Sequence, residues 1–219
     1  MAMKTTSHRA HPIVIAGCGP GAPELMTPAA REAAQAADVL VGARRLLDLF
    51  PSVSAERIPV GVDIDAVLAR MAAIPDTRKI VVLVSGDPGF YSLGRSVLAR
   101  FGRSACRVVA GISSVQAAFA SIGVTWEAAR LVSAHESVPP FRPGTLTGCD
   151  KIAVLAGNRA TAGWLNEAVQ ALNATHAVFA CSDLTLPEER VEQIAADRFE
   201  AASLPSRTVL LFVRKEVLS

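Results

Sequence analysis

The feature that most constrains this chain is the segment of residues 80–92. It opens with five consecutive apolar residues, Ile80 to Val84, and changes abruptly to the turn-forming sequence SGDPG at residues 85–89. A short, β-branched apolar run that ends in turn residues is typical of a strand buried on both faces of a parallel sheet. Helical spacing of apolar residues resumes at Ser92. The order of strand, bend and helix predicts a small-molecule site at the carboxyl edge of an open α/β sheet.

Asp87 is the one charged residue between Lys79 and Arg95. Its simplest interpretation is a turn or helix-capping residue, because Asp is favoured in both positions. A second interpretation is a carboxylate directed at a bound ligand. Gly86 beside it would let a backbone or a ligand approach closely, since glycine has no Cβ. The residues alone leave both interpretations open.

Composition excludes several classes of function. The chain has 219 residues, of which 51% are hydrophobic, so it can bury one large core or two smaller ones. A formal net charge of +2 predicts no general attraction to nucleic acid or to a membrane surface. No apolar run approaches the roughly 20 residues that span a bilayer. Residues 1–11 contain no apolar segment and are expected to form a disordered tail rather than a signal peptide.

The metal-binding residue types are widely scattered. Four cysteines, Cys18, Cys106, Cys149 and Cys181, form no C-x-x-C pair. We expect reduced and mostly buried thiols of a cytoplasmic protein. The four histidines show no metal-ligand spacing, so no metal site is expected.

The element pattern predicts an α/β chain of two lobes. Strands and helices alternate up to Gly123, which indicates βαβ units and a parallel sheet. Strands are expected at 12–16, 39–41, 57–60, 80–84 and 106–109, and helices at 24–37, 44–50, 63–73, 92–100 and 115–122. Beyond residue 130 one helix, 160–172, accompanies strands at 131–133, 151–156, 177–181, 191–195 and 208–214, which predicts a mixed or antiparallel sheet. We therefore expect an amino-terminal α/β lobe at 12–125, a carboxyl-terminal α/β lobe at 126–219, and a ligand cleft between them.

The glycine-rich segment after the first strand invites a dinucleotide-binding interpretation, but its spacing argues against one. The third glycine of G-x-G-x-G at residues 17–21 comes two positions after the second, not three. Pro20 and Pro23 also remove N–H donors that a pyrophosphate would need. A tight strand-to-helix loop at the mouth of the cleft is the better interpretation.

Two further groups of polar residues have open interpretations. Ser113 and Ser114 follow a strand and open a helix, so they could cap it. If their strand neighbours the strand of residues 80–84, their hydroxyls would instead join the Asp87 bend in one pocket. His135, in a loop beside Glu136, could be a general base or simply a solvated side chain. No phosphate-loop lysine or G-x-S-x-G context supports nucleotide hydrolysis or a serine nucleophile.

Three segments together resemble the motifs of the tetrapyrrole methylases, S-adenosylmethionine-dependent enzymes of two α/β lobes. Residues 17–27 (GCGPGAPELMT) resemble the amino-terminal G-x-G-P-G…E-L-x-T signature of that family. Residues 85–88 (SGDP) resemble its G-D-P loop, and residues 111–114 (GISS) its G-[IV]-S-S element. The resemblance extends over about residues 12–215.

Finer stretches resemble the branch of the family that acts on carbon 5 of a precorrin, the precorrin-6Y C5,15-methyltransferase type. These stretches are residues 37–47, residues 113–118 with Trp126, and residues 183–191. The chain departs from the branch at 182–183, where Ser-Asp replaces the usual Glu-Asn, and at 133–137, where SAHES replaces S-x-H-G-R. Fused relatives carry a further carboxyl-terminal domain for carbon-15 methylation and decarboxylation. The resemblance therefore implies a separate partner for that step.

The resemblance implies a methyltransferase of cobalamin biosynthesis that methylates carbon 5 of precorrin-7 or cobalt-precorrin-7. S-adenosyl-L-methionine would be the cofactor, S-adenosyl-L-homocysteine the product, and the protein a cytoplasmic homodimer. The family's cofactor contacts, carried over by position, are Pro20, Gly86, Asp87, Phe90, Ser113, Ser114, Ala156 and Ala180. Arginines that could meet the ring carboxylates are Arg44, Arg45, Arg95 and Arg159, unless they are ordinary surface residues.

No catalytic group is assigned by the resemblance. A sulfonium methyl group is already activated, so alignment and exclusion of water are the main demands on the protein. Two alternatives stay open at this point. One is a related methylase with another substrate, such as uroporphyrinogen, and the other is a module that binds a nucleoside or a tetrapyrrole without turnover.

Overall fold

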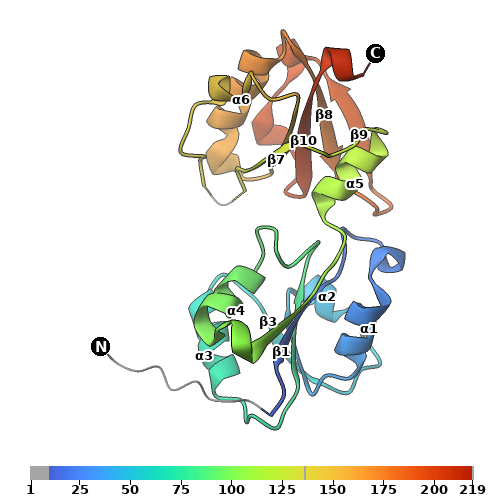
Figure 1. Cartoon of the computed structure of the whole chain (residues 1–219), viewed down its shortest axis with the longest axis vertical. Helices are drawn as coiled ribbons and strands as arrows, with labels where there is room; N and C mark the ends of the chain where they lie inside the picture. The colour runs from blue at the N-terminus through green and yellow to red at the C-terminus, as the bar shows by residue number, and fades with distance from the viewer. Residues whose placement is uncertain (1–9, 136, 219) are drawn as a thin grey trace. The chain divides into compact units, whose positions relative to one another are not determined.

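The computed structural model describes residues 10–135 and 137–218 and shows two compact units (Figure 1). The first unit ends at Ser113 and the second begins at Ser114. Most of the expected tail, residues 1–9, lies outside the described residues.

The first unit is built on a parallel five-stranded sheet in the order β3-β2-β4-β1-β5. Its strands are β1 (Ile13–Gly17), β2 (Val39–Gly42), β3 (Glu56–Pro59), β4 (Ile80–Val84) and β5 (Cys106–Val109). All five residues of β4 are buried, because β4 lies in the middle of the sheet with helices over both faces. The interpretation of the apolar run 80–84 is thereby confirmed.

Helices cover the two faces of this sheet in pairs. The helices are α1 (Pro28–Gln35), α2 (Arg44–Leu47), α3 (Ile64–Ala72) and α4 (Gly94–Phe101). On one face, Ala34 of α1 and Leu47 of α2 share a core with Leu83 of β4. On the other, Met71 of α3 and Val97 of α4 share a core with β1, β2 and β4 (Figure 1). The neighbouring strands β1 and β4 therefore lead into helices on opposite faces, which defines a topological switch point at their carboxyl ends.

The second unit contains a mixed sheet in the order β6-β7-β10-β8-β9. Its strands are β6 (Arg130–Ser133), β7 (Lys151–Leu155), β8 (His176–Ser182), β9 (Arg190–Ile194) and β10 (Thr208–Arg214). Strands β6 and β7 are parallel, and the other pairs are antiparallel. Helix α6 (Ala162–Leu172) packs on one face through Trp164, Leu165 and Leu172. The expected fold class, a parallel sheet followed by a mixed one, is confirmed.

Two features differ from the sequence pattern. The helix expected over residues 24–37 is divided into a 3-10 turn, Pro23–Leu25, and α1, which starts at Pro28. Thr27 caps α1 by accepting a hydrogen bond from the Ala30 N–H at 3.3 Å, and Pro28 suits the first helical position because it has no N–H to satisfy. Helix α5 (Ser114–Ser121) groups with the second unit, where it lies beside β10, rather than ending the first lobe near residue 125.

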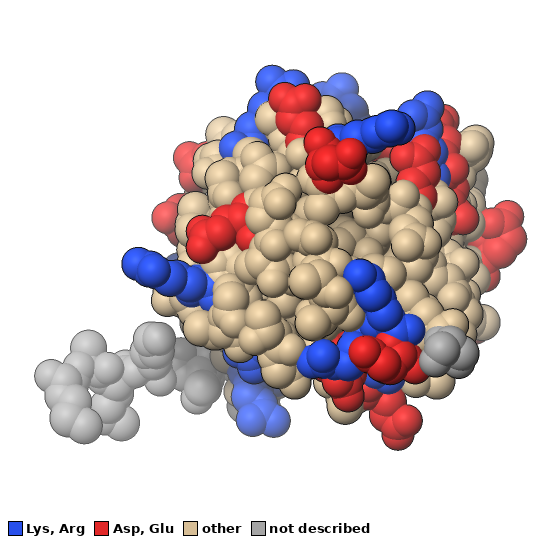
Figure 2. Space-filling view, turned by 90° about the horizontal axis from the view of Figure 1, so that it is seen from above, with Lys and Arg blue, Asp and Glu red and all other residues tan. Residues whose placement is uncertain are grey.

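The surface of the described residues carries mixed charge. Figure 2 shows Lys and Arg side chains beside Asp and Glu on the face in view, with no separation into a basic and an acidic half. Among residues 10–135 and 137–218, none of the helices has both the length and the apolar character that a bilayer crossing requires.

Candidate functional site

The loops that follow β1 and β4 stay paired beyond the carboxyl edge of the first sheet. Gly19 and Gly86 form an antiparallel bridge. The Gly86 N–H donates to the Gly19 carbonyl at 2.8 Å, and the Gly19 N–H donates to the Gly86 carbonyl at 3.3 Å. The Cys18 N–H also donates to the Val84 carbonyl at 2.8 Å. The two loops at the switch point therefore form one continuous backbone surface.

The loop after β5 joins this surface because two glycines, Gly17 and Gly111, have no room for a side chain against the Gly86 carbonyl. A Cβ on Gly17 would lie 2.6 Å from the Gly86 carbonyl oxygen, and a Cβ on Gly111 would lie 2.4 Å from the same atom. Real Cβ atoms essentially never approach another atom so closely. The glycines at 17, 86 and 111 thus allow three backbones to meet. This packing agrees with the tight-loop interpretation of the glycine-rich segment.

Asp87 connects two of the three loops. Its Oδ1 accepts a hydrogen bond from the Gly89 N–H at 2.8 Å, within its own bend. Its Oδ2 accepts a hydrogen bond from the Gly111 N–H at 3.1 Å, in the loop after β5. The turn interpretation of Asp87 is confirmed, and the bond to Gly111 adds a tie between loops that the sequence did not show. A carboxylate has about four lone-pair sites, so this half-buried group can still accept a hydrogen bond from a hydroxyl of a ligand.

The other residues carried over into the first unit lie on the same edge. Pro20 belongs to the loop after β1 and is half-buried, while Ser113, at the end of the β5 loop, is 9% exposed. Phe90 belongs to the β4 loop and contacts Tyr91 edge to face, with ring centroids 4.9 Å apart. Tyr91 has a φ of 43°, a backbone conformation that costs energy outside glycine. Five of the proposed cofactor contacts therefore meet at one sheet edge.

The remaining carried-over residues lie in the second unit. Ser114 begins α5. Ala156 follows β7 and donates its N–H to the Thr208 carbonyl at 2.9 Å. Ala180 lies inside β8, paired with both β9 and β10, and its side chain is part of the hydrophobic core. Ala156 and Ala180 are both buried, with 2% and 7% of their surfaces exposed.

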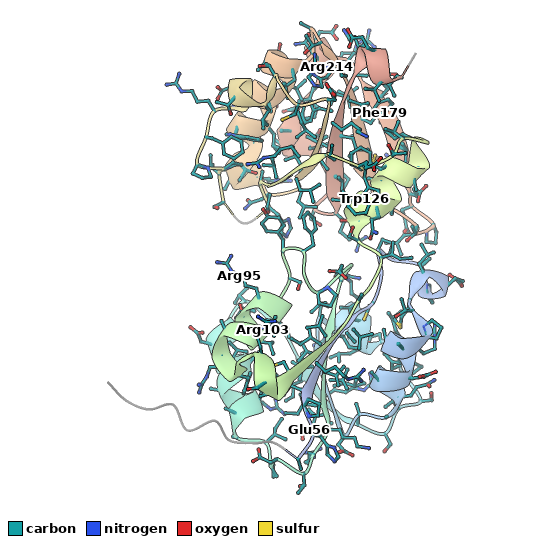
Figure 3. The ribbon with its side chains drawn as sticks, viewed as in Figure 1. Glu56, Arg95, Arg103, Trp126, Phe179 and Arg214 are labelled. Atoms are coloured by element: carbon teal, nitrogen blue, oxygen red, sulfur yellow. The ribbon has the colours of Figure 1, made fainter. Side chains whose placement is uncertain are left out.

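Arg45 is the candidate arginine that the structure connects to the switch point. Its guanidinium donates to the Ser85 hydroxyl at the end of β4. Burial raises the pKa of the neighbouring Cys18 thiol to about 11, against the opposing effect of the Arg45 charge. Cys18 is therefore a neutral thiol near pH 7, not a nucleophile. The other three arginines, Arg44, Arg95 and Arg159, have exposed side chains (Figure 3 labels Arg95).

The opposite edge of the first sheet carries ion pairs instead of glycine loops. Glu56, at the start of β3, pairs with Arg78 at 2.7 Å and with Arg70 at 2.8 Å (Figure 3 labels Glu56). Hydrogen bonds from these two guanidinium groups lower the pKa of the Glu56 carboxyl. The charged side chains at that edge pair with one another, whereas the candidate ligand-binding groups lie at the carboxyl edge.

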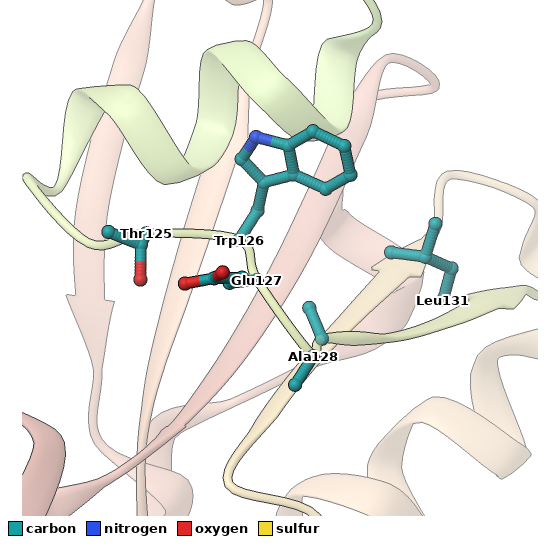
Figure 4. A pocket seen from close by; sticks show the side chains of 6 residues that line it. Thr125, Trp126, Glu127, Ala128 and Leu131 are labelled. Carbon is teal, nitrogen blue, oxygen red and sulfur yellow. The ribbon is translucent and has the colours of Figure 1, made fainter.

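A separate pocket lies on the second unit. It has a volume of about 560 Å³ and is lined by Thr125, Trp126, Glu127, Ala128, Ala129 and Leu131 (Figure 4). The Trp126 side chain is 51% exposed, and none of the eight carried-over cofactor residues lines the pocket. Within the described part of the chain, no group of three or more His, Cys, Asp or Glu side chains is placed to hold a metal ion.

Comparisons with known proteins place the geometry in a family context. A sequence model of the Tetrapyrrole (Corrin/Porphyrin) Methylases matches residues 12–198. The chain is 40% identical over 147 residues to the cobalt-precorrin-7 C(5)-methyltransferase of Salmonella typhimurium, an alignment that covers 67% of this chain and 72% of that protein.

Solved structures agree with this sequence similarity. The precorrin-6Y methylase of cobalamin biosynthesis from Archaeoglobus fulgidus superposes with a TM-score of 0.72 at 26% identity, covering 94% of this chain and 99% of that one. The uroporphyrin-III C-methyltransferase of Thermus thermophilus, complexed with S-adenosylhomocysteine, superposes with a TM-score of 0.71 at 22% identity, covering 94% and 93%. The second likeness shows a shared fold.

The contact of three backbones at the switch point generates a testable expectation. Replacing Gly111 with alanine should lower the free energy of unfolding by about 1–3 kcal/mol, because the new Cβ meets the Gly86 carbonyl and not a flexible side chain. Urea unfolding followed by far-UV circular dichroism measures the change. Gly61→Ala is the matched control, since a Cβ there meets nothing within 4 Å, and it should change stability by less than about 0.5 kcal/mol. Equal losses in the two variants would contradict the packing argument.

Proposed function

This chain belongs to the tetrapyrrole (corrin/porphyrin) methylases, and we propose that it transfers a methyl group from S-adenosylmethionine to carbon 5 of precorrin-7 or cobalt-precorrin-7 in cobalamin biosynthesis. The observation that carries the proposal is the 40% identity to the Salmonella typhimurium enzyme over two-thirds of this chain. At that identity, a related methylase acting on uroporphyrinogen and a binding module without turnover are both less favoured.

The loops at the switch point suit a nucleoside cofactor. The half-buried Asp87 carboxylate can accept hydrogen bonds from hydroxyl groups while it holds the Gly111 N–H. Gly86 offers backbone without a side chain, and Pro20 and Phe90 offer apolar surface beside it. Ser113 adds a hydroxyl at the end of the third loop. These residues are our proposed contacts of S-adenosylmethionine, together with Ser114, Ala156 and Ala180.

The chemistry required of the chain is modest. When bound, S-adenosylmethionine supplies a methyl group activated by its positive sulfonium. The residues of this chain then have to bind the donor, hold the macrocycle carbon in line with the methyl group, and keep water out. The Gly19–Gly86 bridge and the Asp87–Gly111 hydrogen bond fix these loops, so the loops can hold the donor in one orientation.

Charge complementarity indicates how the macrocycle would be oriented. A tetrapyrrole of this pathway bears several carboxylates, and guanidinium groups bind carboxylates through paired hydrogen bonds. Arg45 is the candidate best placed for this role, because its contact with Ser85 puts it at the end of β4. Arg44, Arg95 and Arg159 remain further candidates.

The setting of the enzyme completes the proposal. The four cysteines are free thiols, two of them buried, which supports a reducing cytoplasmic location. A separate carbon-15 methyltransferase and decarboxylase would act on the same macrocycle.

A direct assay tests the proposed reaction. The purified protein, incubated with methyl-labelled S-adenosylmethionine, should transfer label to precorrin-7 or to its cobalt form. Nuclear magnetic resonance of the product should place the methyl group on carbon 5. Uroporphyrinogen III serves as the control substrate and should remain unlabelled. Transfer to uroporphyrinogen alone, or to none of the three, would contradict the proposal.

Asp87 provides a test of the proposed cofactor site. Asp87→Ala should weaken binding of S-adenosylhomocysteine at least about tenfold, because hydrogen bonds to a charged group contribute about 1.5–3 kcal/mol. Calorimetric titration measures the affinity, and circular dichroism checks that the variant keeps its fold. Asp65→Ala, in the first turn of α3, is the matched control and should bind like the wild type. An unchanged affinity in Asp87→Ala would remove Asp87 from the site.

The oligomeric state is also part of the proposal. From its resemblance to the family we propose a homodimer. Light scattering coupled to size-exclusion chromatography should give twice the chain mass of 23.0 kDa. A monomer at micromolar concentration would contradict this expectation.

A further inference from the structure

His135 lies where two parallel strands of the second unit end together. It follows β6, and its ring reaches the residue that follows β7. The His135 Nδ1 lies 3.2 Å from the Ala156 carbonyl oxygen. A carbonyl oxygen can only accept a hydrogen bond, so Nδ1 must carry the proton. In a neutral ring, the lone pair then resides on Nε2, which makes Nε2 the basic nitrogen.

The backbone around the ring is held from several directions. Asn158 donates its side-chain amide to the His135 carbonyl at 2.8 Å. The buried Thr161 hydroxyl donates to the Ala134 carbonyl at 2.7 Å. Gly157, with a φ of 94°, lets this turn lie against Ser206 so closely that a Cβ would be 2.3 Å from the Ser206 carbonyl oxygen. A solvated loop histidine would need no such support.

His176 shows what a structural histidine looks like in the same unit. It is 1% exposed, and both of its ring nitrogens have partners. Its Nδ1 lies 2.8 Å from the Thr175 hydroxyl, and its Nε2 lies 2.8 Å from the Cys149 carbonyl oxygen. The His135 side chain is exposed instead, and among the described residues no hydrogen bond involves its Nε2. His135 thus has one nitrogen fixed and one available.

We propose that His135 is the general base of the reaction, an inference that rests on the proposed function. Ala156, whose carbonyl oxygen holds the ring, is one of the proposed contacts of the methyl donor, and on that proposal the imidazole would lie close to the bound donor. Addition of a methyl cation leaves the macrocycle with one extra positive charge. A C–H or N–H bond of the macrocycle then breaks, its electron pair returns to the conjugated system, and the proton goes to Nε2. The exposed imidazolium passes that proton to water.

Imidazole suits this task because one ring nitrogen can accept a proton while the other donates a hydrogen bond. Positioned general bases typically contribute 10²- to 10⁴-fold to a rate. The sequence suggested His135 as a base but could not name a hydrogen-bond partner for its ring. The structure shows that partner, the Ala156 carbonyl oxygen, which fixes the ring tautomer. The competing interpretation is purely structural, with His135 tying the end of β6 to the end of β7.

The His135→Asn variant separates the two interpretations. An asparagine amide can still donate to the Ala156 carbonyl, but it cannot accept the proton. We expect the rate of methyl transfer to precorrin-7 or cobalt-precorrin-7 to fall 10²- to 10⁴-fold, with the affinity for S-adenosylhomocysteine and the melting temperature unchanged. In His135→Ala, added imidazole should restore part of the rate. His11→Asn, before β1 in the first unit, is the matched control and should keep the full rate.

A second measurement does not depend on activity. Nitrogen-15 spectra of the ligand-free protein should show His135 as the Nδ1–H tautomer, with the signal assigned by its loss in His135→Asn. A predominant Nε2–H tautomer at alkaline pH would overturn the inference. So would a wild-type rate in His135→Asn, or equal losses of rate and of S-adenosylhomocysteine affinity without rescue by imidazole. A wild-type protein that transfers no methyl group would instead refute the proposed function.

Discussion

The close approach of three backbones at Gly17, Gly86 and Gly111 is the constraint on which the first unit depends. Parallel strands β4 and β5 flank β1 and are not neighbours themselves, yet all three carboxyl ends emerge at the same edge of the sheet. A side chain at Gly17 or Gly111 would meet the Gly86 carbonyl oxygen, so the loops could not lie this close together. Asp87 then fixes the third loop by accepting the Gly111 N–H. The glycines let the three loops lie close together, and the hydrogen bonds of the Asp87 carboxylate hold two of them in fixed positions.

This arrangement matches the demands of methyl transfer from an activated donor. Such a reaction needs alignment more than a strong nucleophile, because the donor is already a cation. Burial keeps Cys18, the most nucleophilic residue type near the switch point, in its neutral thiol form. The opposite edge of the sheet carries the ion pairs of Glu56, so the two ends of the same strands are specialised differently. One end carries stabilising ion pairs, and the other carries the backbone, hydroxyl and carboxylate groups that we propose as contacts of the methyl donor.

The sequence predicted the strands well because burial on both faces leaves an unmistakable apolar run, as at Ile80–Val84. It was less informative where one residue serves two partners. For Asp87 the sequence left a turn residue and a ligand-directed carboxylate both open, and nothing local could reveal its bond to Gly111 in another loop. Helix α1 began later than its apolar spacing indicated, because Thr27 and Pro28 set the start through capping and not through hydrophobicity. Ala180 matched a family position, but its burial between β9 and β10 depends on strand pairing, which a single sequence does not contain.

The same limit explains why the two histidines of the second unit could not be told apart beforehand. His135 and His176 are identical side chains, and their surroundings differ in burial and in the groups that face their ring nitrogens. A hydroxyl at Nδ1 and a carbonyl at Nε2 occupy both nitrogens of His176, whereas a carbonyl at Nδ1 alone fixes the His135 tautomer and directs basicity to Nε2. The β6–β7 pairing brings the end of each strand to one place, and the turn at Gly157 lets the Ala156 carbonyl face the ring. Backbone geometry therefore underlies the proposal in each unit: glycine loops form the proposed donor edge in the first, and a single carbonyl orients the proposed base in the second.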